Sequence, residues 1–254
     1  MIQALHVQAF RQFDEVEHQS WQTVYLNLDR CRKQQAFSTF NDGLNALQIE
    51  GNRIPDLDQV NKRLMELTGW RAVPVDGLEG GNSFYPALSR REYPIGNFIR
   101  DASDLGYTPA PDIIHDLYGH IPLLANTEYA DFCQRYALTA CKYLENPQKL
   151  DCFERFFWFT VEFGLIETPA GRRIFGAGIL SSKAESDYAL SSAPEVIDFS
   201  IEAIARQDYR IDEFQHRLFL LQSTQQLYSS LPEVERWIQS NDPLPLFPIQ
   251  QRKN

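Results

Sequence analysis

The chain has 254 residues, of which 43% are hydrophobic and 23% are charged, as is usual for soluble globular proteins. Its 34 acidic side chains outnumber the 24 lysines and arginines, so the formal net charge is -10. Because nucleic acids and anionic membranes are bound through clustered Lys and Arg, this excess of acid argues against both as partners.

The four cysteines predict free thiols rather than a disulfide framework. They include no C-x-x-C pair, and each lies in a segment with a helical apolar pattern. The sequence shows no secretory leader and no uninterrupted apolar run of about 18 residues, the length that would suggest a membrane span. We therefore expect a cytoplasmic protein, working as a monomer or a weak oligomer.

No repeat, low-complexity tract or Gly/Ser linker divides the chain, so we expect a single domain over residues 1–254. Residues 1–70 would form a helical lead-in, residues 71–225 would carry the functional site, and residues 226–254 would form a C-terminal helix and tail. The expected fold class is mainly α, of the α+β kind, with helices around the site and a small β-sheet.

In the first hundred residues the sequence pattern changes once, from helical to loop-forming. Apolar residues at helical spacing predict helices over residues 13–37 and 56–67, the second ending at Gly69. Residues 70–100 combine several Pro and Gly with aromatic side chains, which predicts loops and short strands.

Helix dominates the middle of the chain. The apolar pattern predicts helices over residues 112–118, 127–143 and 148–165. Residues 174–180 and 209–221 are rich in β-branched and aromatic side chains, and are expected to add a small sheet beside these helices.

The C-terminal part returns to amphipathic patterns. Residues 195–206 and 232–240 are predicted to be helices. Residues 242–254 contain three prolines and a charged end, which predicts an extended tail.

Two of only five histidines, His115 and His120, lie close together in the sequence. On a regular α-helix, residues five apart point about 140° away from each other, so such a helix would not direct both rings at one ion. Gly119 offers a solution, because a glycine can adopt the left-handed conformation that ends a helix, and Pro122 prevents continuation. His120 could then turn back toward His115.

Glu162 is the candidate for a third ligand. Most of its neighbours between Phe156 and Leu165 are apolar, and a buried carboxylate needs a partner. Two histidines and one carboxylate on one face of a metal leave positions open for oxygen and water, as in non-haem Fe(II) oxygenases. The residues alone also allow a plainer interpretation, in which the histidines are a helix cap and a core residue.

Three sequence blocks resemble the catalytic domain of the pterin-dependent aromatic amino acid hydroxylases. They are YTPAPDIIHDLYGHIPL at residues 107–123, WFTVEFGL at 158–165 and FGAGILSS at 175–182. The likeness runs in order from about residue 74 to residue 221, with matching spacings. The resemblance implies an enzyme closest to bacterial phenylalanine hydroxylases, with Fe(II) held by His115, His120 and Glu162.

The same resemblance implies a set of substrate contacts. Arg100 matches the arginine that holds the carboxylate of the amino acid, which suits the bidentate geometry of a guanidinium. Ser181 matches a serine beside the backbone groups of the substrate. The remaining expected contacts, which include the pocket for the aromatic ring, are Thr108, Pro111, Trp158 and Phe163. Asp112 precedes His115 by one helical turn and either accepts its ring N–H or caps the short helix.

The resemblance also implies a tetrahydropterin cofactor, which is tetrahydrobiopterin or a related compound. We expect it to bind against the loop that begins near Val75. Phe84 would stack on its ring, and Gly77 and Leu78 would line it. Asp116 would reach it through water. Animal members have Glu where this chain has Asp116, so the water-mediated contact spans a longer gap.

Phenylalanine is the expected substrate, because Trp158 is typical of phenylalanine hydroxylases, whereas the tryptophan enzymes tend to have Phe there. Ile211 stands where tyrosine hydroxylases carry Asp. O₂ would supply the oxygen, with tyrosine as the product. The alternatives are the same chemistry on tryptophan or at C3 of phenylalanine, and a zinc-type hydrolase using the same ligands. A non-catalytic relative also stays open, because the chain departs from the family pattern at three positions. Besides Asp116, Ala110 replaces an acidic residue, and Phe157 replaces the tyrosine that precedes the tryptophan in animal members.

Overall fold

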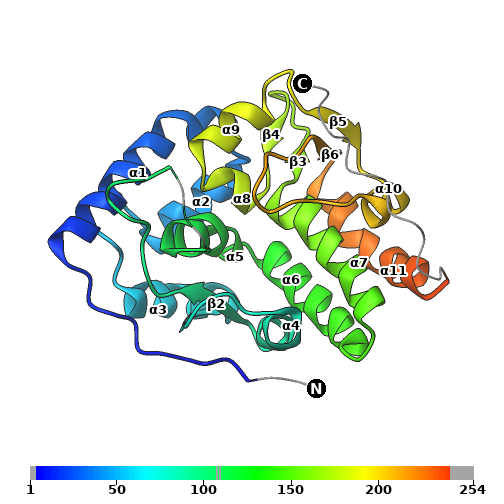
Figure 1. Cartoon of the computed structure of the whole chain (residues 1–254), viewed down its shortest axis with the longest axis horizontal. Helices are drawn as coiled ribbons and strands as arrows, with labels where there is room; N and C mark the ends of the chain where they lie inside the picture. Colours follow the sequence, from blue (N-terminus) through cyan, green and yellow to red (C-terminus); the bar gives the residue numbers. More distant parts are fainter. Residues whose placement is uncertain (1–3, 107, 109, 241–254) are drawn as a thin grey trace.

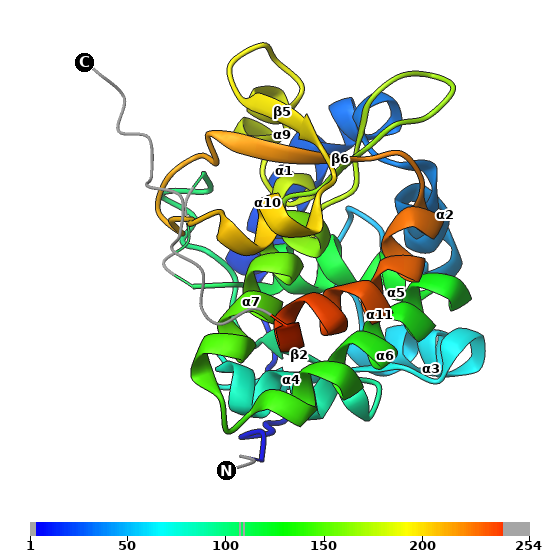
Figure 2. The same cartoon turned by 90° about the vertical axis from the view of Figure 1, so that its right-hand side faces the viewer.

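The computed structural model describes residues 4–106, 108 and 110–240 of the chain. Helices dominate this part (Figures 1 and 2). The α-helices are α1 (Glu15–Gln35), α2 (Ser38–Leu47), α3 (Leu57–Thr68), α4 (Gly81–Ser89), α5 (Ile121–Leu124), α6 (Thr127–Ala140), α7 (Pro147–Phe157), α8 (Ala177–Leu180), α9 (Lys183–Ala189), α10 (Ile201–Arg206) and α11 (Thr224–Ser240). Two π-helices, η1 (Ile114–His120) and η3 (Trp158–Glu162), and the 3-10 turn η2 (Cys141–Tyr143) complete the helical elements of the described residues.

The strands of the described residues form two small sheets. They are β1 (Arg71–Val75), β2 (Glu92–Gly96), β3 (Leu165–Ile166), β4 (Arg173–Ile174), β5 (Glu195–Asp198) and β6 (Arg217–Leu221). One sheet pairs β1 with β2 in parallel, and the other has the order β4-β3-β6-β5. The expected fold class, mainly α with a small sheet component, is confirmed.

Capping residues explain where the N-terminal helices begin and end. Asp14 closes a capping box with Glu17 at the start of α1, and Asp56 caps α3, which ends at the left-handed Gly69. Both predicted helices are confirmed. Helix α2 was not predicted; it crosses α5 so closely that a Cβ on Gly43 would lie 1.9 Å from the Pro122 carbonyl oxygen.

The prediction of loops and short strands over residues 70–100 is right for the two strands and wrong for α4. Gly80, Gly81 and Pro86 suggested a loop, yet the chain forms nine residues of helix between β1 and β2. A parallel pair needs a crossover of this kind. Burial of Tyr85, Ala87 and Leu88 stabilises α4 despite the proline.

The central helices agree with prediction in position but not always in type. Helix α6, continued by η2, matches residues 127–143, and Asn126 and Asn146 cap α6 and α7. The helix predicted over 148–165 changes into the π-helix η3 after Phe157 and ends at Glu162. The short helix predicted at 112–118 is the π-helix η1.

The chain after residue 170 departs most from prediction. Of the strand expected over residues 174–180 only Ile174 is a strand residue, as the last residue of β4, and α8 follows it. Gly176 explains the change, because a Cβ there would lie 2.2 Å from the Glu162 carbonyl oxygen, and the chain turns at this contact. Strand β6 forms the end of the segment predicted over 209–221.

The helix predicted over 195–206 begins instead as the strand β5, which pairs in parallel with β6. Its helical part is only α10, capped by Ser200. Helix α11 contains the predicted helix 232–240 but starts at Thr224. The tail predicted over 242–254 lies outside the described residues.

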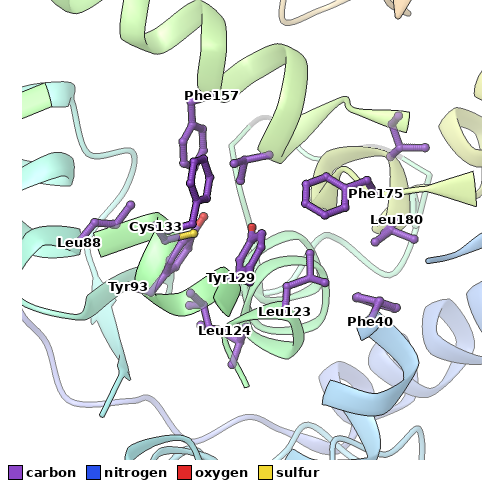
Figure 3. Close-up of a cluster of buried hydrophobic side chains, with 14 of the residues drawn as sticks. Phe40, Leu88, Tyr93, Leu123, Leu124, Tyr129, Cys133, Phe157, Phe175 and Leu180 are labelled. Carbon is purple, nitrogen blue, oxygen red and sulfur yellow. The ribbon is translucent and has the colours of Figure 1, made fainter. Parts of the chain in front are cut away.

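One continuous core joins these elements. Helices α5 and α6 run through the middle, with α3, β2 and α4 on one side and the four-stranded sheet on the opposite side (Figures 1 and 2). Figure 3 shows side chains from distant segments, among them Phe40, Leu124 and Phe175, gathered in this core. Among the described residues, no helix is long and apolar enough to cross a membrane.

Candidate active site

The two histidines lie on the π-helix η1, which brings them together. Their Nε2 atoms are 3.3 Å apart and their ring centroids 5.0 Å apart. In a π-helix the backbone bonds run from i to i+5, so the wider turn carries residues five apart to the same side. The expectation that Gly119 adopts a left-handed conformation is wrong, because Gly119 stays within the helix.

Gly119 has a different function in the structure, which is to let α8 approach η1. A Cβ at this position would lie 3.0 Å from the Ala177 carbonyl oxygen and 3.3 Å from the Ser181 Cβ. Both distances are tighter than ordinary van der Waals contact. The glycine therefore places Ser181 beside the histidine-bearing helix.

Glu162 faces both histidines from the end of η3. Its Oε1 lies 3.0 Å from His120 Nε2, and its Oε2 lies 3.5 Å from His115 Nε2. The three potential ligand atoms all lie within 4.8 Å of one another. The structure thus brings together the three residues that the sequence singled out.

The electrostatics of this cluster favour metal ligation. Burial lowers the pKa of His115 to about 4, so its ring is neutral at pH 7 and offers a lone pair. Burial alone would raise the pKa of Glu162, but the facing His120 and His115 rings outweigh it and hold that pKa below its usual value. Burial also opposes the charged form of His120, yet Glu162 and Asp116 raise its pKa.

The donor set fits a divalent metal. Two Nε2 atoms 3.3 Å apart share at most one proton, and the buried Oε2 of Glu162 has no hydrogen-bond partner among the described residues. An ion between these three groups would satisfy all of them. Two imidazoles and one carboxylate are the ligands of non-haem Fe(II) oxygenases.

Ser181 and Asp112 both contact His115, Ser181 at the ring and Asp112 at the backbone. The Ser181 hydroxyl donates to the Gly178 carbonyl oxygen and lies 3.3 Å from His115 Nδ1. Asp112 accepts a hydrogen bond from the backbone N–H of His115 at 3.0 Å. Asp112 therefore caps the short helix, and does not accept the ring N–H of His115. Ser181, rather than Asp112, is the neighbour of the His115 ring nitrogen that faces away from Glu162.

Arg100 is buried and bound to Asp112. Its Nε and Nη2 each donate to the carboxylate at 2.9 Å, and its Nη1 lies 3.4 Å from the Leu105 carbonyl oxygen. The structure therefore excludes a solvated rim position for this arginine. Thr108 donates its hydroxyl to the Ala110 carbonyl oxygen. Neither Arg100 nor Thr108 is among the described residues that line the neighbouring cavity.

A cavity of about 350 Å³ opens beside the cluster. It brings together many of the predicted site residues, and its lining includes His115, Glu162, Pro111, Trp158, Asp116, Gly77, Leu78 and Phe84. Further lining residues, which the sequence did not single out for the site, include Tyr85, Tyr93, Glu79, Glu154 and Tyr209. All the predicted pterin residues thus line one cavity, but of the predicted substrate residues only Pro111 and Trp158 do.

Aromatic rings form one wall of the cavity. Trp158 packs against Phe163 with ring centroids 4.5 Å apart, and stacks on Tyr209 at the same distance. Phe163 is not among the lining residues, so it supports Trp158 from outside. Tyr209 could have been noticed from the sequence, because it is an isolated aromatic residue two positions before Ile211.

A second aromatic group surrounds His120. The Tyr93 ring stacks on it with centroids 5.0 Å apart, and Phe157 lies 6.4 Å from it in a stacked orientation. Phe84 meets Phe157 and Tyr93 edge to face, at 5.4 and 5.8 Å. Rings packed in this way fix the orientation of the proposed ligand.

The loop before α4 also lines the cavity. Gly77 has a φ of 84°, in the left-handed region that favours glycine, and the Leu78 side chain is 75% exposed. Asp116 accepts the Gly96 N–H at 2.7 Å. Burial raises the pKa of Asp116 to about 7, although His120 and the Gly96 hydrogen bond act in the opposite direction.

Comparisons with known proteins agree with this geometry. A family model described as biopterin-dependent aromatic amino acid hydroxylase matches residues 7–242. The phenylalanine-4-hydroxylase of Chromobacterium violaceum is 39% identical over 224 residues, which cover 88% of this chain and 75% of that protein.

Two solved structures of phenylalanine hydroxylase from the same organism have a similar fold. One, with bound iron(III) and oxidized 7,8-dihydrobiopterin, has a TM-score of 0.87 at 34% identity and covers 99% of this chain and 93% of that one. The other, with iron and phenylalanine, has a TM-score of 0.85 at 35% identity and covers 95% and 89%. The chain belongs to the biopterin-dependent aromatic amino acid hydroxylase family.

Proposed function

We propose that this chain is a phenylalanine 4-monooxygenase, which uses Fe(II), a tetrahydropterin and O₂ to convert L-phenylalanine into tyrosine. The observation that carries the proposal is the meeting of His115, His120 and Glu162 within 4.8 Å beside an aromatic-lined cavity. Similar proteins described as phenylalanine-4-hydroxylase support the substrate, and a similar structure holds both iron and dihydrobiopterin.

His115, His120 and Glu162 would hold the iron. When bound, the iron and the reduced pterin would together supply the electrons that activate O₂, so that one oxygen atom enters the aromatic ring and the other is reduced. The protein keeps the His115 ring neutral by burying it, and Ser181 and Asp112 fix its direction. The stacked Tyr93 and Phe157 rings keep water away from His120.

The substrate would lie against Trp158 and Pro111, both of which line the cavity, with Phe163 supporting the Trp158 ring. Asp112 holds Nε and Nη2 of Arg100, and Nη1 makes only a 3.4 Å contact with the Leu105 carbonyl oxygen, so the second N–H of Nη1 would be the donor for a substrate carboxylate. Thr108 and Ser181 would contact the polar end of the amino acid.

The pterin would occupy the part of the cavity that the loop before α4 lines. Phe84 would stack on its ring, while Gly77 and Leu78 would line it and Asp116 would reach it through water. This placement is supported by their common position around the cavity. It puts the cofactor between the loop before α4 and the proposed metal.

We further propose that the protein works in the cytoplasm as a monomer or weak oligomer, without nucleic acid or membrane partners. The acidic net charge of -10 and the four free cysteines support this setting.

The proposal is tested by anaerobic loading with Fe(II), followed by product analysis with phenylalanine, tryptophan and tyrosine in parallel. We expect tyrosine from phenylalanine, at a rate that depends on both pterin and O₂. A preference for tryptophan would overturn the substrate assignment. Activity with zinc and without pterin would indicate a hydrolase, and bound iron without turnover of any aromatic amino acid would indicate a non-catalytic relative.

A further inference from the structure

Glu154 brings a carboxylate to the cavity that the metal and substrate assignments do not use. It lies on α7, three residues before Phe157 and four before Trp158, and all three line the cavity. Its Oε1 faces the start of α4, since a Cβ on Gly81 would lie 2.8 Å from it. The carboxylate therefore lies beside the start of α4, which directly follows the loop that carries Gly77 and Leu78.

The other carboxylates of the lining already have partners. Glu79 accepts the Ser83 hydroxyl, Asp116 accepts the Gly96 N–H, and Glu162 faces the two histidines. Glu154 alone among these four has no hydrogen-bond or ion-pair partner in the described part of the chain. It is half-buried, and burial together with the nearby Asp151 raises its pKa. No protein group of the described residues donates to this half-buried carboxylate, so it is available to accept hydrogen bonds from a ligand in the cavity.

The residues that line the cavity also indicate which kind of ligand fits it. It contains four carboxylates and, among the described residues, no lysine or arginine. An anionic group such as a phosphate would be repelled at this place, whereas neutral hydroxyl groups would be accepted. The chemistry therefore matches an unphosphorylated, hydroxyl-bearing group.

The position of Glu154 indicates which part of the cofactor it meets. Glu154 precedes Glu162 by eight residues, about 12 Å along the segment at the rise of an α-helix, so it lies toward the end of the cavity away from the proposed metal site. The pterin ring must lie near the metal, because both act on the same O₂. The side chain of the pterin is then the part that reaches Glu154.

We propose that Glu154 is a cofactor-selecting residue, whose carboxylate accepts hydrogen bonds from hydroxyl groups on the side chain of an unphosphorylated tetrahydropterin. This inference rests on the proposed pterin-dependent function. Glu154 would set the affinity for the cofactor and its selectivity, without taking part in oxygen transfer.

The test compares two cofactors that differ only in this side chain, tetrahydrobiopterin and 6-methyltetrahydropterin. For the iron-loaded wild type and Glu154→Ala we would measure kcat and KM with each. Binding of the corresponding dihydropterins would be measured by calorimetry, without turnover. We expect Glu154→Ala to weaken tetrahydrobiopterin about 10- to 100-fold, mainly in KM, as for loss of a hydrogen bond to a charged group. The methyl compound should be little affected.

Asp151→Asn is the matched control, because it removes a carboxylate one turn earlier on α7 that pairs with Arg155 and does not line the cavity. It should keep the wild-type selectivity. Equal weakening of both pterins by Glu154→Ala would mean that the carboxylate only supports the loop, and unchanged binding of both would also overturn the inference. Failure of the wild type to use either pterin would instead refute the proposed function.

Discussion

A buried hydroxyl sets the direction of one proposed metal ligand. Ser181 Oγ lies 3.3 Å from His115 Nδ1, and its own proton goes to the Gly178 carbonyl oxygen. The hydroxyl oxygen can therefore accept the Nδ1 proton, which leaves Nε2 unprotonated toward Glu162. Partners of this kind fix the tautomer of a ligating histidine and raise its basicity.

We expect Ser181→Ala to weaken Fe(II) binding by about 10-fold or more while the protein stays folded, because the His115 ring loses its orienting contact. The dissociation constant would be measured by competition with a chelator. Ser186→Ala is the control, since Ser186 is also buried nearby but donates to the Ile179 carbonyl oxygen and not to a proposed ligand. Equal iron affinity in wild type and Ser181→Ala would contradict this function for Ser181.

At the scale of elements, the two π-helices explain how the ligands converge. The residue pattern made His115, His120 and Glu162 candidates for a metal site, and the resemblance of the surrounding sequence blocks favoured ligation over a helix cap and a core residue. It could not predict the π-turns, since nothing in the local sequence distinguishes an i to i+5 ladder from the ordinary one. The structure needs no left-handed glycine, because the wider turn already aligns the rings.

Other elements were missed for related reasons. Gly80, Gly81 and Pro86 predicted a loop where α4 forms, because local propensity was overridden by burial against the core. The β-branched residues near Ile174 predicted a longer strand, but the close approach of Gly176 to the Glu162 backbone ends it. Such tertiary contacts are not visible in a single sequence.

The packing of α8 on η1 depends on Gly119, so we expect Gly119→Ala to separate them. The added methyl group would meet the Ala177 carbonyl oxygen and the Ser181 Cβ. Overpacking of this kind typically costs about 1 to 3 kcal/mol, and iron affinity should fall as Ser181 moves away from His115. Urea unfolding and iron titration would measure both effects. Gly106→Ala is the control, because its Cβ would approach only the Asp104 side chain at 3.5 Å, and it should change neither stability nor iron affinity. Wild-type stability and iron affinity in Gly119→Ala would refute the packing argument.

Helix α9 carries a carboxyl group that makes stability depend on pH. Burial raises the pKa of Glu185 from 4.5 to about 7. Between these values the unfolded chain has lost this proton and the folded protein keeps it, so the free energy of unfolding falls as pH rises, and the contribution levels off above pH 7.

We expect Glu185→Gln to remove this fall, which amounts to at most about 3 kcal/mol. Urea unfolding of wild type and variant at several pH values between 5 and 8 would measure the difference. The variant should gain stability over the wild type as pH rises. A difference that stays constant across this range would show that Glu185 titrates normally in the folded protein.

At the scale of the whole molecule, the core connects the N-terminal helices to the site. Trp21 and Trp70 are fully buried, and they belong to the same core cluster as Phe175 and Ile238. We therefore propose that residues 1–254 fold as one domain, in which the lead-in helices support the site region rather than forming a separate unit.

A single cooperative unfolding transition is expected from this arrangement. Tryptophan fluorescence, which reports on both the N-terminal helices and the site, should follow the same urea curve as far-ultraviolet circular dichroism. An early fluorescence transition with most of the helix signal retained would show that the lead-in unfolds separately.

The central claim is that His115, His120 and Glu162 form one iron site that serves catalysis. The most direct measurement is the iron content of purified, Fe(II)-loaded wild type, His120→Ala and Glu162→Ala, with circular dichroism of each to show that it is folded. His216→Ala is the control, because it removes a histidine outside the site. We predict one iron per chain in the wild type and in His216→Ala, and loss of iron with an intact fold in both site variants. Full iron content in folded His120→Ala or Glu162→Ala would contradict the assignment.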